Sequence, residues 1–528
     1  MRAFATLINR LDSTNKTNQK LEAIQEFLKD GDDQDKLWFL ALFTGKRPKR
    51  VLNTTLMRSW LLDLVNLPEW LFLESYASVG DLSETISLML PAPSTYVDYS
   101  LSEWMEKILD LKNKTDDEKK AFVMQSWDSL PHIERFIFNK LLGGSFRVGI
   151  SSQSLINAIA SFYQLEPSAV SHSIMGEWTM ENTSFDKLIQ GEYSDSSLSK
   201  PYPFCLVHPI GSIEETLTDL SQWSAEYKWD GIRGQIIKRK GEVFIWSRGE
   251  ELVSKQFPEL LDAFLQWEGD FVLDGEILAW KDGQILNFSM LQKRLNRKVL
   301  SQGILEEVPV GIFLYDLLEL DTVDWRDQTF IERRAALTHL YQQQIPVPNI
   351  RLSELVSFQN LEDLKQIRLG SRAINSEGLM LKNKSSKYHV GRKRGDWWKW
   401  KVDPYSIDAV LIYAQKGSGR RSSFYTDYTF AVKDGDQLVT IAKAYSGLTD
   451  VEIKEVSRFV NANSIEKFGP VRTVKPSLVF EIAFEGISWS NRHKAGVALR
   501  FPRIARWRKD KDITEIDDLT TLKELIKP

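Results

Sequence analysis

Apolar residues recur every three to four positions through roughly the first 200 residues of the chain. In TNQKLEAIQEFLKDG, for example, Leu21 and Ile24 share one helical face. Thr115 and Glu118 open another helical segment as a capping-box pair. No alternating pattern typical of a strand competes with these segments, so an all-α domain is predicted over residues 1–200.

The pattern changes after SLSKPYPFCLVHPIG, where serines and prolines indicate a linker. Short apolar or alternating segments follow, among them GQIIKRKGEVFIWSR, DFVLDGEILAW and VPVGIFLYDLLEL, and a hairpin turn is predicted at Lys240 and Gly241. Helix-like segments such as KQFPELLDAFLQW lie between them. A mixed α/β domain is therefore predicted over residues 205–402.

Beyond VDPYSIDAV the apolar residues alternate with period two, as in TFAVKDGDQLVTIAKAYSG and SLVFEIAFEGISWS. Asp434 and Gly435 form a typical hairpin turn pair. About five short strands close naturally into a small β-barrel, which is predicted over residues 403–528. The predicted fold class is thus a multidomain α+β chain.

The composition is that of a soluble globular protein, with 42% hydrophobic and 27% charged residues. No run of about 18 apolar residues occurs, so no membrane span is expected. The first residues lack the apolar core of a signal peptide. The single cysteine, Cys205, excludes an intramolecular disulfide and a zinc site built from several thiolates, and it fits a reducing setting.

Charge is nearly balanced overall, with 68 basic against 72 acidic residues, yet it is uneven along the chain. Residues 382–401 hold eight Lys or Arg against one acid, Asp396, and residues 492–511 hold eight against Asp510. Either stretch alone is adequately explained as a solvated face. Together, on a chain of net charge −4, they indicate a defined site for a polyanion.

The segment EYKWDGIRGQ carries the first candidate chemistry. It places Lys228 between Glu226 and Asp230, followed by a turn at Gly231 and then Arg233. A lysine nucleophile needs burial, nearby cations or a metal to favour its neutral form, and its attack on a phosphate gives a phosphoramidate. At this point a solvated surface strand remains an alternative interpretation.

Further groups suited to nucleotide chemistry follow downstream. Each one alone could be a turn acid, a core aromatic residue or an exposed strand edge, but their joint occurrence in this order favours a nucleotide site. These groups are Arg248 in WSRGEE, Glu276 at the expected end of a strand in LDGEILAW, Tyr315 and Asp316 in IFLYDLL, Glu377 in SEGLMLKN, and Lys399 and Lys401 in WWKWKVD.

These segments resemble the motifs of the covalent nucleotidyltransferases, which include DNA ligases, RNA ligases and mRNA capping enzymes. EYKWDGIR resembles motif I, SRGEE motif Ia, LDGEILAW motif III, FLYDLL motif IIIa, SEGLMLK motif IV and KWK motif V. LRFPRIARWRKDK resembles motif VI in the form found in ATP-dependent DNA ligases, and NKLLGGSFRVGIS is similar to the segment of the ligase DNA-binding domain that follows the minor groove.

The resemblance spans nearly the whole chain and is strongest to bacterial ATP-dependent DNA ligases. It implies a helical DNA-binding domain over residues 1–200, a nucleotidyltransferase (adenylation) domain over 205–402 and an OB-fold domain over 403–528. It also implies lysine adenylation, transfer of AMP to a DNA 5′-phosphate, and attack by the 3′-hydroxyl. The OB-fold would close on ATP through motif VI and then swing away, with a hinge near Asp403 and Pro404.

The resemblance assigns a role to each candidate residue. Lys228 would attack the α-phosphate, Glu226 would orient the adenosine, and Tyr315 would stack on the base where phenylalanine is usual. Glu276 and Glu377 would hold Mg²⁺, for which Mn²⁺ could substitute. The nucleotide-binding residues implied in addition to Glu226 and Tyr315 are Arg233, Arg248, Glu276, Lys399, Lys401, Arg500 and Arg508. The role of Asp230 is left open.

Nicked duplex DNA and ATP are the expected partners. DNA contacts should be mainly to phosphates, without base readout, and should weaken with salt. GKRPKR also resembles a nuclear localisation signal, but a DNA-binding loop fits better within a helical domain of a bacterial chain. The predicted DNA-binding residues are Lys46, Arg47, Lys49, Arg50, Lys140, Arg147, Arg420 and Arg421.

The resemblance further suggests a role in DNA repair, replication or recombination, an associated helicase and exonuclease, a monomeric state, and a cytoplasmic location at the nucleoid. Two other functions are consistent with part of this pattern. An RNA ligase or capping enzyme shares motifs I to V but would lack this helical domain and this motif VI. A DNA-end-binding protein with a decayed site would have lost at least one of Lys228, Glu276, Glu377 and Lys399. The sequence has no four-cysteine zinc module, which an NAD-dependent ligase would be expected to carry.

Overall fold

The computed structural model describes residues 1–14, 16–46, 48, 50–144, 150–175, 178–191, 198–249, 251–295, 297, 299–417 and 423–526. Contacts divide the chain into two compact units. The first unit consists of Met1–Ser13, Thr44–Gly149 and Asp403–Pro528. The second consists of Thr14–Phe43 and Ile150–Val402.

Helices account for the regular structure in the described part of residues 1–191. Their apolar faces are buried as the helical period predicts, and the capping box of Thr115 and Glu118 is confirmed at the start of α8. The second unit contains α2 (Thr17–Asp30), α3 (Asp33–Phe43), α10 (Ser152–Tyr163), α11 (Pro167–Ser173) and α12 (Phe185–Gln190). The first unit contains α1 (Arg2–Ser13), α4 (Thr54–Val65), α5 (Glu69–Val79), α6 (Leu82–Met89), α7 (Leu101–Asp110), α8 (Asp116–Ser129) and α9 (His132–Gly143).

The rest of the second unit is built on two sheets. A seven-stranded sheet has the order β10-β8-β6-β4-β5, with β7 paired to β6 and β9 to β8. The predicted turn at Lys240 and Gly241 joins β4 to β5, and both residues have positive φ, as a tight hairpin requires. The strands are β4 (Ile232–Arg239), β5 (Glu242–Ser247), β6 (Phe271–Lys281), β7 (Gln284–Ile285), β8 (Val310–Leu320), β9 (Val323–Asp324) and β10 (Ile350–Leu352).

The second sheet has five strands in the order β11-β3-β12-β14-β2, and β1 pairs separately with β13. These strands are β1 (Cys205–Leu206), β2 (His208–Pro209), β3 (Trp223–Trp229), β11 (Leu355–Val356), β12 (Ser376–Asn383), β13 (Gly391–Arg392) and β14 (Trp397–Lys401). The helices around both sheets are α13 (Ile213–Thr216), α14 (Pro258–Leu265), α15 (Phe288–Leu295), α16 (Gln302–Glu307), α17 (Phe330–Gln343) and α18 (Leu361–Gly370).

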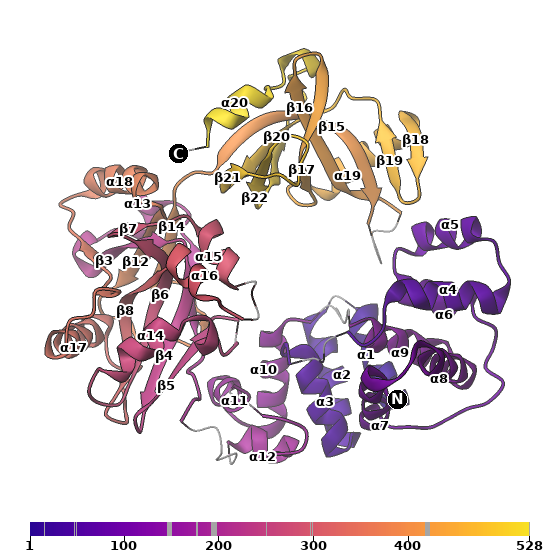
Figure 1. Cartoon of the computed structure of the whole chain (residues 1–528), viewed down its shortest axis with the longest axis horizontal. Coiled ribbons are helices and arrows are strands. Elements are labelled where there is room, and N and C mark those ends of the chain that lie inside the picture. Colours follow the sequence, from indigo (N-terminus) through magenta and orange to yellow (C-terminus); the bar gives the residue numbers. More distant parts are fainter. Residues whose placement is uncertain are drawn as a thin grey trace. The chain divides into compact units, whose positions relative to one another are not determined.

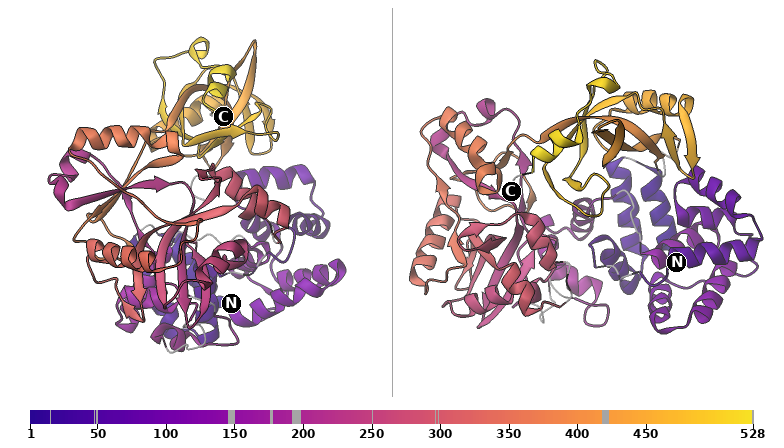
Figure 2. Two further views of the ribbon diagram at one scale, coloured as in Figure 1. Left: turned by 60° about the vertical axis from the view of Figure 1, so that its left-hand side comes forward. Right: turned by 45° about the horizontal axis from the view of Figure 1, so that its top comes forward.

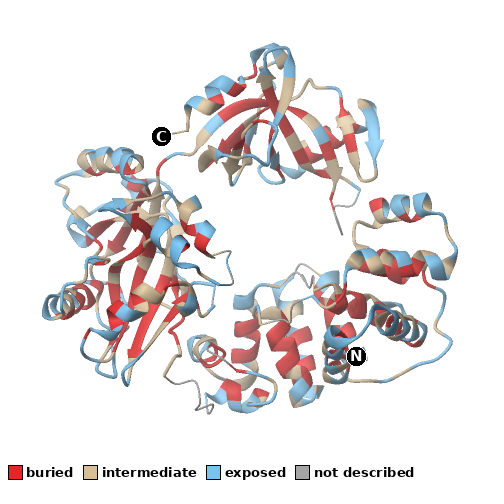
Figure 3. Cartoon of the chain, viewed as in Figure 1, coloured by how far each residue is buried: buried red, intermediate tan, exposed pale blue. Residues whose placement is uncertain are grey.

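Apolar packing joins the two sheets. One buried cluster contains Ile237 and Leu318 of the seven-stranded sheet together with Trp397 of the five-stranded sheet, and Phe330 at the start of α17 belongs to it. Figure 3 shows buried residues running along β4, β6 and β8, with exposed residues on the outer turns of the helices. The relative position of the two sheets is therefore fixed by a shared core.

The C-terminal part of the first unit is rich in strands, which are curved in every view (Figures 1 and 2). The sheet order is β17-β16-β15-β19-β18, β20 pairs with β15 and β23, and β21 pairs with β22. The elements are β15 (Tyr405–Lys416), β16 (Tyr425–Asp434), β17 (Gln437–Ala444), α19 (Asp450–Ala462), β18 (Ser464–Phe468), β19 (Val471–Val474), β20 (Val479–Phe484), β21 (Gly486–Trp489), β22 (Val497–Arg500), β23 (Arg503–Trp507) and α20 (Leu519–Glu524). None of the described helices is both long enough and apolar enough to cross a bilayer.

Candidate active site

The turn after β3 requires Gly231, the first glycine of EYKWDGIRGQ. A Cβ atom at Gly231 would lie 2.3 Å from the carbonyl oxygen of Ile277 on β6. Because that neighbour is backbone, no side-chain movement could relieve the clash. Gly231 thus lets the β3–β4 turn approach β6 closely, which brings Lys228 and Glu276 into one site.

Lys228, Glu377 and Lys401 form a charged cluster on three adjacent strands. Lys228 Nζ on β3 donates to Glu377 Oε2 on β12 and forms an ion pair with it. Lys401 Nζ on β14 lies 3.3 Å from the same carboxylate. The three side chains are 16 to 30% exposed, so the cluster is accessible to a ligand. The sequence alone could not show that these distant segments meet.

Lys399 is two residues from Lys401 on β14 and faces the same cluster, as the alternation of the strand predicts. Burial lowers the pKa of Lys399, and the positive charges of Lys228 and Lys401 lower it further. Arg392 and Arg248 contribute in the same direction. The arrangement concentrates positive charge beside Lys228, as binding a chain of phosphates requires.

Glu276 was predicted at the end of a strand, but it lies in the middle of the eleven-residue β6, directly opposite Arg233 on β4. Burial raises the pKa of Glu276 to about 7, the cations of Lys228 and Arg233 oppose the rise, and the carboxylate of Glu377 adds to it. Two carboxylates that repel one another suit Mg²⁺, which binds through one or two carboxylates together with phosphates. No group of three or more His, Cys, Asp or Glu side chains suited to a metal occurs within the described ranges.

Arg233 is held in a buried network. Its Nη2 lies 2.5 Å from Asp274 Oδ2 and 3.1 Å from the hydroxyl of Tyr388, and its Nη1 donates to the carbonyl oxygen of Cys205. The guanidinium lies 5.8 Å from the centre of the Tyr315 ring. Arg233 therefore borders the predicted base site. Both of its terminal nitrogens bind protein groups, whereas its buried Nε has no hydrogen-bond partner among the described residues.

Glu226 lies on β3, two residues before Lys228, and is 2% exposed. Its carboxylate pairs with Arg334 Nη1 at 3.1 Å and with Lys382 Nζ at 2.5 Å. Lys382 Nζ also lies 4.6 Å from the centre of the Tyr315 ring. The sequence analysis did not single out Lys382 or Arg334, although Lys382 belongs to SEGLMLKN, the segment that supplies Glu377.

Three matches cover most of the sequence. Residues 204–401 match the family model described as "ATP dependent DNA ligase domain", residues 1–160 match "DNA ligase N terminus", and residues 421–511 match "ATP dependent DNA ligase C terminal region". A "Probable DNA ligase" of Koribacter versatilis is 36% identical over 413 residues, which cover 74% of this chain and 71% of the relative.

The chain belongs to the ATP-dependent DNA ligase family.

Other relatives match the chain to different extents. "DNA ligase 1" of Korarchaeum cryptofilum is 26% identical over 99% of this chain and 98% of its own length. A "Probable DNA ligase" of Opitutus terrae is 40% identical over 57% of this chain but only 32% of its own length. The solved structure called Pmar-Lig_PreS3 matches 96% of this chain and 99% of its own with a TM-score of 0.62 at 16% identity, which supports the fold alone.

Motif VI of this ligase lies in the first unit, where its cations pair with local carboxylates. Arg508 binds Asp408 at 2.9 Å and Asp510 at 2.7 Å, and Lys511 binds Asp408 at 2.7 Å. The hydrogen bonds from Arg508 lower the pKa of Asp510 to about 2. Arg500 at the end of β22 stands 5.1 Å from the centre of the Phe501 ring.

The predicted DNA-binding residues fall into two groups. Among the described residues, Lys46 follows α3, Arg50 donates to Leu52 O at 2.7 Å and to Asn53 Oδ1 at 2.7 Å before α4, and Lys140 on α9 pairs with Asp81. These three residues belong to the first unit, whereas the Lys228 cluster belongs to the second. Arg47, Lys49, Arg147, Arg420 and Arg421 lie outside the described residues.

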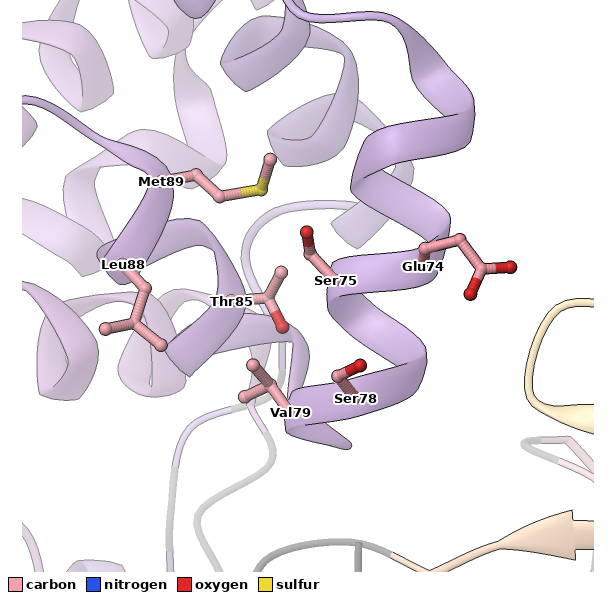
Figure 4. Close-up of a pocket in the computed structure, with 7 residues that line it drawn as sticks. All are labelled: Glu74, Ser75, Ser78, Val79, Thr85, Leu88 and Met89. Atoms are coloured by element: carbon pink, nitrogen blue, oxygen red, sulfur yellow. The ribbon is translucent and has the colours of Figure 1, made fainter. Parts of the chain in front are cut away.

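A cavity of about 400 Å³ lies between α5 and α6 (Figure 4). Glu74 is its only titratable side chain, and no residue predicted to bind ATP, metal or DNA lines it. The remaining lining residues are Ser75, Ser78, Val79, Thr85, Leu88 and Met89.

Proposed function

We propose that this ligase seals nicks in duplex DNA through an AMP intermediate on Lys228. The observation that supports the proposal is the cluster of Lys228, Lys399, Lys401 and Glu377 beside Glu276. It combines one nucleophile, two further lysines for phosphate charge and two carboxylates, all in a partly exposed site.

In the first step Lys228 Nζ forms a bond to the α-phosphorus of ATP. The bond from this phosphorus to the oxygen bridging to the β-phosphate breaks, and pyrophosphate leaves with the bonding electrons. Glu377 Oε2 is the hydrogen-bond acceptor for Nζ, so it is placed to take the proton that Lys228 must lose. Lys399 and Lys401 stabilise the charge that develops on the α-phosphate.

In the later steps the 5′-phosphate of the nick displaces Lys228 from AMP, and the 3′-hydroxyl then attacks that phosphate and releases AMP. Glu276 and Glu377 would hold Mg²⁺, or Mn²⁺ in its place, and this ion would neutralise charge on the phosphates. Glu226 and Tyr315 would orient the adenosine. Arg233 and Arg248 would contact the ribose or phosphates.

The remaining assignments follow from the motifs and from membership of the family. They are a helical DNA-binding domain over 1–200, an adenylation domain over 205–402 and an OB-fold over 403–528 with a hinge near Asp403 and Pro404. Arg500 and Arg508 would approach ATP when the OB-fold closes. A repair role, a monomeric state, an associated helicase and exonuclease, and a nucleoid location in the cytoplasm belong to the same proposal.

The test is a labelling experiment with ATP or GTP that carries a labelled α-phosphate, in the presence of Mg²⁺, followed by a chase with nicked DNA. The wild-type protein should become labelled with ATP, and the label should move to DNA before it appears as AMP. Lys228→Ala should remain unlabelled, whereas Lys387→Ala, which alters an exposed lysine paired with Asp327, should behave as wild type. Labelling by GTP alone, or persistent label on Lys228→Ala, would contradict the proposal.

A further inference from the structure

Two consecutive arginines on α17, Arg333 and Arg334, are both buried, at 0% and 7% exposure. The helix starts with a capping box formed by Thr329 and Glu332, which fixes its first turn. Successive residues of an α-helix point about 100° apart. Their guanidinium groups consequently reach different parts of the second unit.

Arg333 reaches the seven-stranded sheet. Its Nε and Nη2 bind the two oxygens of Asp316 on β8 at 2.8 Å and 3.0 Å, and both residues are fully buried. Asp316 directly follows Tyr315, the predicted base-stacking residue. The bidentate pair therefore attaches α17 beside that ring.

Arg334 reaches the five-stranded sheet. Its Nη1 binds Glu226 Oε1 at 3.1 Å, and its Nη2 donates to the carbonyl oxygen of Ser353. The amide of Ser353 in turn donates to Leu314 O on β8 at 2.7 Å. The Arg334 guanidinium thus connects the Glu226 carboxylate, through Ser353, to β8, the strand that carries Tyr315.

We infer that Arg334 is a positioning residue for ATP binding, because its guanidinium fixes the Glu226 carboxylate relative to the Tyr315 ring. This inference rests on the proposed role of Glu226 in orienting the adenosine. A guanidinium can serve two acceptors with a planar, rigid geometry, which an ammonium cannot reproduce. With Arg334 removed, Glu226 keeps Lys382 as a partner but loses the contact that defines its orientation.

A purely structural role would have different consequences. If Arg334 only stabilised the fold, its loss would lower the amount of folded enzyme and leave the KM for ATP unchanged. A role in positioning Glu226 predicts a change in KM and in the discrimination between bases, because the affected contacts are those to the nucleoside rather than to the phosphates.

The experiment measures the rate of Lys228 labelling against ATP concentration in full-length Arg334→Met, with GTP as a competitor. The KM for ATP should rise about tenfold, equivalent to about 1.4 kcal/mol, while kcat stays within about threefold. Competition by GTP should become stronger. Arg334→Lys, which keeps the charge, should fold and show an intermediate KM. Arg326→Met, which alters an arginine paired with Asp324, is the matched control and should leave KM unchanged.

A double substitution gives the decisive comparison. If Arg334 acts through Glu226, then Arg334→Met combined with Glu226→Gln should raise KM no more than the stronger single change does. Additive increases, or an unchanged KM in folded Arg334→Met and Arg334→Lys, would overturn the inference. Lys228→Ala in the same assay separates the two proposals: label on Lys228→Ala contradicts the proposed nucleophile, whereas an unchanged KM for Arg334 variants contradicts only the inference.

Discussion

Two groups of ionic side chains in the second unit differ in exposure. The cluster of Lys228, Glu377 and Lys401 is 16 to 30% exposed. The pair of Arg333 and Asp316 is fully buried. Because exposed charges keep much of their hydration, the first group can exchange its internal partners for a ligand. The second group has no access to solvent, so its partners must remain paired for the fold to persist.

This difference indicates a division of roles. We expect the accessible cations to contribute chemistry and little stability, and the buried cations to contribute geometry and stability. A substitution in each group should therefore affect a different measurement, and four substitutions test the comparison.

The largest expected effect is in the accessible cluster. Lys228→Ala should reduce adenylation by at least about 10³-fold, as removal of a nucleophile does in other enzymes. Its melting temperature should stay close to that of the wild type, because Glu377 retains Lys401 as a partner. Labelling kinetics and thermal unfolding measure the two quantities. A large loss of stability would contradict the division of roles.

The next effect is in the buried pair. Arg333→Met should lower the free energy of unfolding by about 3–5 kcal/mol, because it leaves the Asp316 carboxylate buried without its partner. Lys387→Met is the matched control, since it breaks an exposed pair with Asp327 and should cost no more than about 1 kcal/mol. Urea denaturation measures both. Equal effects in the two variants would show that burial does not distinguish the groups.

Gly231 lies in the turn that follows β3, the strand of Lys228, and it allows this turn to approach the core strand β6 closely. Gly231→Ala should destabilise the protein by about 1–3 kcal/mol and should also slow adenylation, since the new Cβ meets the Ile277 carbonyl. Gly211→Ala is the control, because no atom lies within 4 Å of its added Cβ. A stable Gly231→Ala with normal labelling would refute the role of this close approach.

The smallest effect concerns pH. Burial, assisted by the charge of Lys200, lowers the pKa of His172 to about 4 from an ordinary value of 6.5. Between these values the unfolded chain binds a proton that the folded chain does not, so stability should fall as pH drops from 6.5 to 4. His172→Phe, which keeps a ring stacked on Tyr202, should reduce that slope in urea denaturation at several pH values. If the dependence of stability on pH is the same in His172→Phe as in the wild type, His172 does not contribute to that dependence.

Much of the local structure could be predicted from the sequence. The helical period of residues 17–30, the capping box at Thr115 and the hairpin at Lys240 and Gly241 depend on neighbouring residues, and the structure confirms them. The prediction for Glu276 was less accurate. Asp274 and Gly275 in LDGEILAW form a pair typical of turns, yet β6 runs through both residues and continues to Lys281.

The partners of the candidate residues could not be predicted in the same way. Lys228 and Glu377 are 149 positions apart, and Arg334 and Glu226 are 108 apart, so their pairing depends on strand order and on the packing of α17. A lysine in SEGLMLKN and two arginines in IERRAALTHL have no pattern that distinguishes them from surface residues.

The sequence by itself determined the residue types, their order along the chain and the local elements that carry them, because these follow from short-range periodicity and motif spacing. The tertiary structure decided which charges are accessible and which are buried, because burial arises only when two sheets and a helix pack around a common core. That packing leaves Lys228 partly exposed and buries Arg334, although both are basic residues in ordinary local sequence.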